Sequence, residues 1–133
     1  MLFRSGASPR LLKQAAHWSG GAPILADGVD AEQLALAGDR ILIGNPLDAF
    51  SVREQRLYLD WLAGRPSGDA EASRVRAILV VAGSVPDRRL SHRGGFCAIT
   101  RDKRAVLYRH PCDGAYWSRS LRPRLVDPSE AAR

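Results

Sequence analysis

The sequence predicts an α+β fold, in which helices pack on a small, mostly antiparallel sheet with a C-terminal β-hairpin. An amphipathic pattern over residues 52–63 predicts a helix, and a continuous β-branched run at 77–82 predicts a buried strand. Two apolar segments, 96–101 and 104–110, flank the polar pair Asp102-Lys103, as in a hairpin. A chain of 133 residues, 45% of them hydrophobic, can form one core, so a single domain is expected.

This domain is predicted to cover residues 1–122, and residues 123–133 are predicted to form a flexible tail. The first helix has clear end signals. Ser8 can cap it, Pro9 suits its first turn, and Gly20 ends the amphipathic pattern.

Shorter elements are expected next in the chain. Residues 23–26 form a brief apolar run that fits a short strand, Asp30 is placed to cap a short helix over 32–36, and residues 40–44 are typical of a buried strand. The sheet is predicted to combine the strand at 40–44, the run at 77–82 and the hairpin.

The helix over residues 52–63 has the best-defined ends. Ser51 and Glu54 have the spacing of a capping box, and Gly64 is well placed to stop the helix. Trp61 lies on the apolar side of this helix and is therefore expected in the core.

Residues 74–82 fit two structures. Their β-branched side chains favour a strand, and the alternative is a helix that breaks before Pro86. Residues 83–95 are expected to form a loop. A two-residue turn in the following hairpin would place Cys97 opposite Tyr108.

The positive charge is concentrated in the C-terminal half. Residues 1–66 hold seven basic and seven acidic side chains, whereas residues 67–133 hold 13 basic and seven acidic ones. Between residues 88 and 124 there are ten basic and two acidic side chains. Most of the basic residues are arginines, which a GC-rich genome explains as well as phosphate recognition does. The placement of the charge is therefore better evidence for a binding surface than its chemical type.

Aromatic residues are interleaved with these cations. This combination is typical of single-strand or RNA binding, in which guanidinium groups contact phosphates and rings stack on bases. The alternatives are an acidic protein or self-assembly contact, and a merely solvated surface. The predicted binding residues are Arg88, Arg89, Arg93, Arg101, Lys103, Arg104, Arg109, Tyr116 and Trp117.

Two cysteines and two histidines lie in or near the predicted hairpin. These residue types bind zinc, so the metal candidates are His92, Cys97, His110 and Cys112. Their spacing matches no standard zinc finger, and no cofactor is expected. The predicted register puts Cys112 roughly 13 Å beyond Cys97, too far for a shared site or a disulfide without a bulge. We therefore expect two reduced thiols.

The chain shows no membrane or export signal. No apolar run approaches the roughly 18–20 residues of a membrane helix, and the N-terminus lacks the apolar core of a signal peptide. The sequence therefore predicts a cytoplasmic protein without membrane contact.

The segment Tyr58-Leu59-Asp60-Trp61-Leu62-Ala63-Gly64-Arg65, followed by an apolar run and Arg88-Arg89-Leu90, resembles a known family. It is similar to the N-terminal domain associated with TerB tellurite-resistance proteins. The resemblance covers residues 50–90, under a third of the chain. It implies a stress or defence context without a defined reaction, so no catalytic residue follows from it.

These features predict a small non-enzymatic binding protein whose basic C-terminal half engages a polyanion, with nucleic acid as the first choice. One alternative is a protein–protein adaptor or assembly subunit that contacts an acidic partner, with the Trp61 helix adding apolar contact; a homo-oligomer belongs to this class. Another is a small Cys/His-dependent enzyme or a zinc-binding module. An enzyme of this kind would need a thiolate in contact with a histidine base, which the sequence does not establish.

Overall fold

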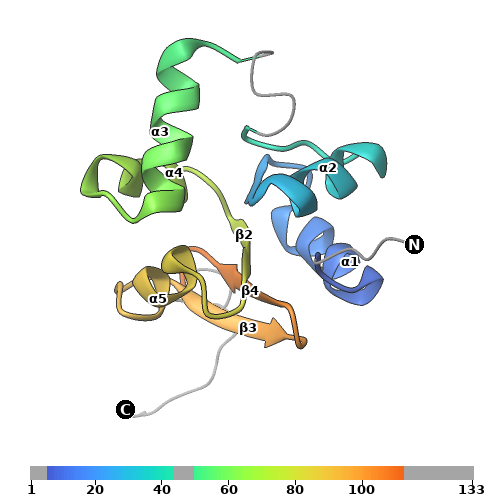
Figure 1. Cartoon of the computed structure of the whole chain (residues 1–133). Helices are drawn as coiled ribbons and strands as arrows, with labels where there is room; N and C mark the ends of the chain where they lie inside the picture. The colour runs from blue at the N-terminus through green and yellow to red at the C-terminus, as the bar shows by residue number, and fades with distance from the viewer. Residues whose placement is uncertain (1–5, 44–49, 113–133) are drawn as a thin grey trace.

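The computed structural model describes residues 6–43 and 50–112, which form a four-stranded sheet between two layers of helices (Figure 1). The strand order is β1-β2-β4-β3. The first pair is parallel and the other two pairs are antiparallel, which confirms the predicted α+β class with its C-terminal hairpin. The strands are β1 (Ile24–Ala26), β2 (Ala77–Val81), β3 (Cys97–Arg101) and β4 (Ala105–Arg109).

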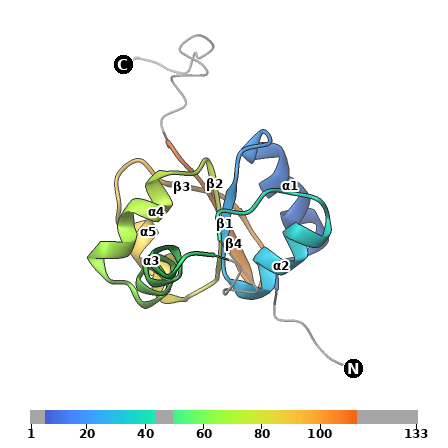
Figure 2. The same ribbon diagram turned by 90° about the horizontal axis from the view of Figure 1, so that it is seen from above.

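Helices cover both faces of the sheet (Figure 2). Helices α1 (Pro9–Ser19) and α2 (Gly28–Leu36) lie on one face. The other face carries α3 (Val52–Ala63), a short 3₁₀ turn η2 (Pro66–Gly68), α4 (Asp69–Ser73) and α5 (Val85–Ser91).

This double cover explains the apolar character of β2. Leu79 packs with Leu11 on the α1 side, whereas Ile78 packs with Trp61 on the α3 side. A strand buried on both faces is continuously apolar instead of alternating. The strand interpretation of residues 74–82 is therefore confirmed.

The helix ends follow their local sequence signals. The Ser8 hydroxyl accepts a hydrogen bond from the backbone N–H of Leu11, and Gly20 closes α1 in the left-handed conformation. Ser51 and Glu54 form the predicted capping box of α3. Trp61 is only 4% exposed, as expected of a core residue.

Two predictions for the N-terminal half are wrong. The cap of α2 is Asp27, whose carboxylate accepts a hydrogen bond from the backbone N–H of Asp30, so the helix begins earlier than expected. The predicted strand at 40–44 is reduced, in its described part, to one bridge between Ile41 and Ile24. The apolar run at 23–26 instead supplies strand β1, which pairs with β2.

The predicted loop at 83–95 contains a helix, α5. Ser84 caps it by accepting a hydrogen bond from the backbone N–H of Asp87. The sequence interpretation treated Pro86 as a breaker. In the first turn of a helix, however, proline lacks only an N–H that has no partner within the helix.

Candidate anion-binding surface and groove

The turn of the β3–β4 hairpin is organised by Asp102. Its carboxylate accepts hydrogen bonds from the backbone N–H groups of Ser8, Arg104 and Ala105, each at 2.8 Å. Burial alone would raise the pKa of this carboxyl, but the hydrogen bonds outweigh that effect and lower the pKa to about 2. The turn also joins the hairpin to the start of α1.

Replacing Asp102 with alanine should lower the free energy of unfolding by about 2 kcal/mol at neutral pH, because three N–H groups lose a charged acceptor. The pKa of this carboxyl is lower in the folded chain than its unfolded value of about 3.9. Its stabilisation is therefore complete above the unfolded pKa and is lost as the pH falls towards the folded pKa of about 2.

Urea unfolding of the wild type and the Asp102→Ala variant, at neutral pH and near the folded pKa, measures this effect. The difference should shrink at the lower pH. Lys103→Ala, an exposed change in the same turn, is the matched control and should leave stability unchanged. Equal stability of Asp102→Ala and wild type at neutral pH would contradict this role.

Basic side chains from α1 and the hairpin meet beside this turn. Arg10 lies 3.3 Å from the Thr100 hydroxyl and 3.5 Å from the carbonyl oxygen of Arg101. Asp102 offsets part of the local positive charge. The exposed cations that form this "basic hairpin end" are Arg10, Arg101, Lys103 and Arg104.

Three other predicted binding residues belong to α5 and the turn after it, on the opposite face of the sheet. Arg89 places one guanidinium nitrogen 2.8 Å from both carboxylate oxygens of Asp69. Arg93 lies 3.9 Å from the same carboxylate and 4.5 Å from the centre of the Phe96 ring. The Arg88 side chain donates to a backbone carbonyl at 2.6 Å. Arg89 thus joins α4 to α5, and Arg93 joins α4 to the turn that follows α5.

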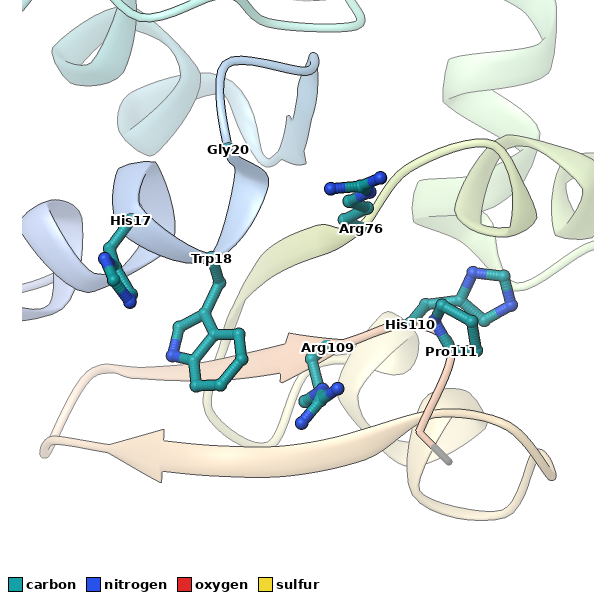
Figure 3. Close-up of a pocket in the computed structure, with 7 residues that line it drawn as sticks. All are labelled: His17, Trp18, Gly20, Arg76, Arg109, His110 and Pro111. Carbon is teal, nitrogen blue, oxygen red and sulfur yellow. The ribbon is translucent and has the colours of Figure 1, made fainter. Parts of the chain in front are cut away.

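A groove of about 660 Å³ opens at the far end of α1, beside the end of β4 (Figure 3). The guanidinium carbon of Arg109 lies 4.7 Å from the centre of the Trp18 ring, a cation–π contact. None of the described residues that line the groove is acidic. They are His17, Trp18, Gly20, Arg76, Arg109, His110 and Pro111.

The two arginines lie between two ring-bearing walls. His17 and Trp18 project on one side, and His110 and Pro111 on the other (Figure 3). The His110 ring stacks on Phe96 with ring centres 4.3 Å apart, and this contact holds the His110 side of the groove in place. Of the predicted binding residues that the structure describes, only Arg109 lines this groove.

Cys97 and Cys112 form a disulfide bond, with Cα atoms 4.9 Å apart. This corrects the prediction of two distant, reduced thiols. Next to the turn Arg101 pairs with Val106, two positions further along than the predicted register, and the bulge after Ala98 takes back one position. Cys97 therefore lies opposite Arg109 instead of Tyr108. The backbone N–H of Cys112 also donates to the carbonyl oxygen of Gly95, which brings Cys112 back towards the start of β3.

The four metal candidates are not brought together. Within residues 6–43 and 50–112, no three His, Cys, Asp or Glu side chains form a group that could hold a metal ion. His92 is exposed, with its Nδ1 atom 2.8 Å from the carbonyl oxygen of Arg88. Zinc binding and nucleophilic catalysis by cysteine require a thiolate. In the disulfide neither sulfur atom is a thiol, so neither cysteine can take these roles in this state.

Fold and surface together define a small α+β protein with a basic, aromatic-lined groove. Comparison of the chain with known protein families, with curated proteins and with solved structures found no match. The resemblance of residues 50–90 to the TerB-associated domain therefore stays a prediction.

Some predictions concern residues outside the described ranges. Tyr116 and Trp117 lie there, as do the end of the predicted domain at residue 122 and the tail at 123–133. Among the helices that the structure describes, none has the length and apolar character needed to cross a membrane.

Proposed function

We propose that this is a non-enzymatic binding protein that holds a polyanion, single-stranded nucleic acid, along the seam between α1 and the β3–β4 hairpin. One observation supports the proposal: cations from both elements gather along this seam. The basic hairpin end lies at the start of α1, and Arg109 stacks on Trp18 near its end. Because α1 has 11 residues and rises about 16 Å, a strand of a few nucleotides would reach both ends.

Each end offers a different part of the required chemistry. The exposed cations of the basic hairpin end can bind phosphate, because one guanidinium group can donate two hydrogen bonds to two oxygens of the same phosphate. The Trp18–Arg109 stack offers a flat cationic surface on which a base can pack. A duplex keeps its bases stacked inside, so single strands should bind more tightly.

Fluorescence anisotropy with labelled single-stranded and duplex oligonucleotides tests this function. If about four phosphates are neutralised, affinity for the single strand should fall on the order of 50-fold between about 50 and about 200 mM salt. Absence of binding at the lower salt concentration would refute the proposal. Equal affinity for polyglutamate would indicate an acidic protein partner instead.

A pair of matched double variants locates the surface. Arg101→Ala with Arg104→Ala removes two cations from the basic hairpin end and should weaken single-strand binding about tenfold or more at low salt. Arg53→Ala with Arg56→Ala removes the same charge from exposed positions on α3, across the sheet. Equal losses in the two pairs would mean that overall charge, and not this seam, determines binding.

A further inference from the structure

Arg76 is held differently from the other arginine of the groove. It precedes β2, its side chain is exposed, and its guanidinium has no hydrogen bond or ion pair with any described residue. Its backbone carbonyl oxygen accepts a hydrogen bond from the N–H of His110 at 2.9 Å, so its Cα position is fixed. Arg109, in contrast, stacks on Trp18. Together, the guanidinium groups of Arg76 and Arg109 favour binding of an anion that has two negative charges or several acceptor oxygens.

The shape of the groove indicates more than an inorganic anion. Its volume of about 660 Å³ falls within the roughly 300–1,000 Å³ typical of small-molecule sites. Its two walls present rings, Trp18 and His17 on one side and His110 with Pro111 on the other (Figure 3). Flat, weakly polar walls beside two cations match a ligand that joins an aromatic ring to an anionic group.

We propose that the groove is a binding site for a nucleoside monophosphate. Its phosphate lies between Arg76 and Arg109, and its base packs against one of the two ring-bearing walls. A free nucleotide and the 5′-phosphate end of a strand offer the same chemistry. The site shares Trp18 and Arg109 with the proposed seam but does not rest on strand binding, because Arg76 takes no part in the contacts proposed for the strand.

NMR titration of the full chain with adenosine monophosphate tests the site. Signals of Trp18, Arg76 and His110 should shift together, with a dissociation constant below about 1 mM. Inorganic phosphate and adenosine should each bind at least about tenfold more weakly, because each offers half of the contacts. Unchanged signals at about 10 mM nucleotide would overturn the proposal, and so would equal affinity for inorganic phosphate, which indicates a plain anion site.

Arg76→Ala is the decisive variant, because Arg76 is exposed and its removal should leave the fold intact. It should weaken binding of adenosine monophosphate about tenfold or more, whereas Arg53→Ala on α3 should have no effect. Equal binding by Arg76→Ala and wild type would refute the assigned site. Loss of nucleotide binding by Arg76→Ala, with normal oligonucleotide binding, supports the site and leaves the proposed function intact. A wild-type protein that binds the oligonucleotide but not the nucleotide overturns the site alone.

Two labelled oligonucleotides that differ only in a 5′-phosphate separate the two sources of the ligand. Tighter binding of the phosphorylated strand, reversed by Arg76→Ala, assigns the groove to strand ends. Equal binding of the two strands, with adenosine monophosphate still bound at Arg76, assigns it to free nucleotides. Either result supports the site, and tighter binding of the unphosphorylated strand contradicts it.

Discussion

Replacing Cys97 and Cys112 with serine is expected to lower the free energy of unfolding by about 3 kcal/mol. The bond joins residues separated by 15 positions in the sequence. A cross-link that closes a loop of this size restricts the unfolded chain and stabilises the folded chain by about that amount. The melting temperature should fall on the order of 10 °C, as measured by calorimetry.

Reductant supplies the matched control for this prediction. It should lower the melting temperature of the wild type by the same amount and leave the double serine variant unchanged. Alkylation of the unfolded wild type should modify neither cysteine before reduction and both after it. Two reactive thiols in the untreated protein would contradict the disulfide.

The state of the disulfide depends on the compartment in which the protein resides. Disulfides persist in oxidising compartments and are rare in cytosolic proteins. The bond between Cys97 and Cys112 is therefore expected to be reduced in the cytoplasm that the sequence predicts and to persist in an oxidising compartment. Alkylation of free thiols at the moment of cell lysis would record the state of the two cysteines in place.

The elements that the sequence predicts correctly depend on local chemistry. Ser8 and the capping box at Ser51 define helix starts through hydrogen bonds to residues three positions away. Such signals lie within one turn of chain and need no knowledge of the fold. Helix α5 was missed because a proline signals both a break and a first turn. Only the cap at Ser84 distinguishes the two meanings.

Long-range contacts account for the parts that the sequence did not predict. Pairing of Ala77 with Arg109 between β2 and β4 brings Arg76 to the groove from a distant part of the chain. The charge-rich stretch was predicted as one surface, yet the fold places α5 and the seam on opposite faces of the sheet. The acids that pair with its cations, such as Asp69, lie outside that stretch. Net charge along the sequence therefore locates the cations and not the surface that they form.

Substitution of Gly68 by alanine is expected to lower the free energy of unfolding by about 3 kcal/mol, because the site is already filled by backbone. A Cβ atom at Gly68 would overlap the backbone nitrogen of Trp61 and lie 2.5 Å from its Cα atom. Main-chain atoms inside α3 cannot move aside as the end of a flexible side chain can, so η2 and α3 must separate.

Gly94→Ala is the matched control for Gly68→Ala. Among the described residues, no heavy atom beyond its chain neighbours lies within 4 Å of a Cβ atom at Gly94, so this variant should unfold at the same urea concentration as the wild type or slightly above it. A midpoint for Gly68→Ala equal to that of Gly94→Ala would show that η2 does not pack against α3 as closely as the structure has it.

The displacement of η2 expected in Gly68→Ala also affects the arginines on the α5 side of the sheet. Asp69 directly follows Gly68 and holds both Arg89 and Arg93, so displacing η2 should weaken those ion pairs while leaving the seam, on the other side of the sheet, unaffected.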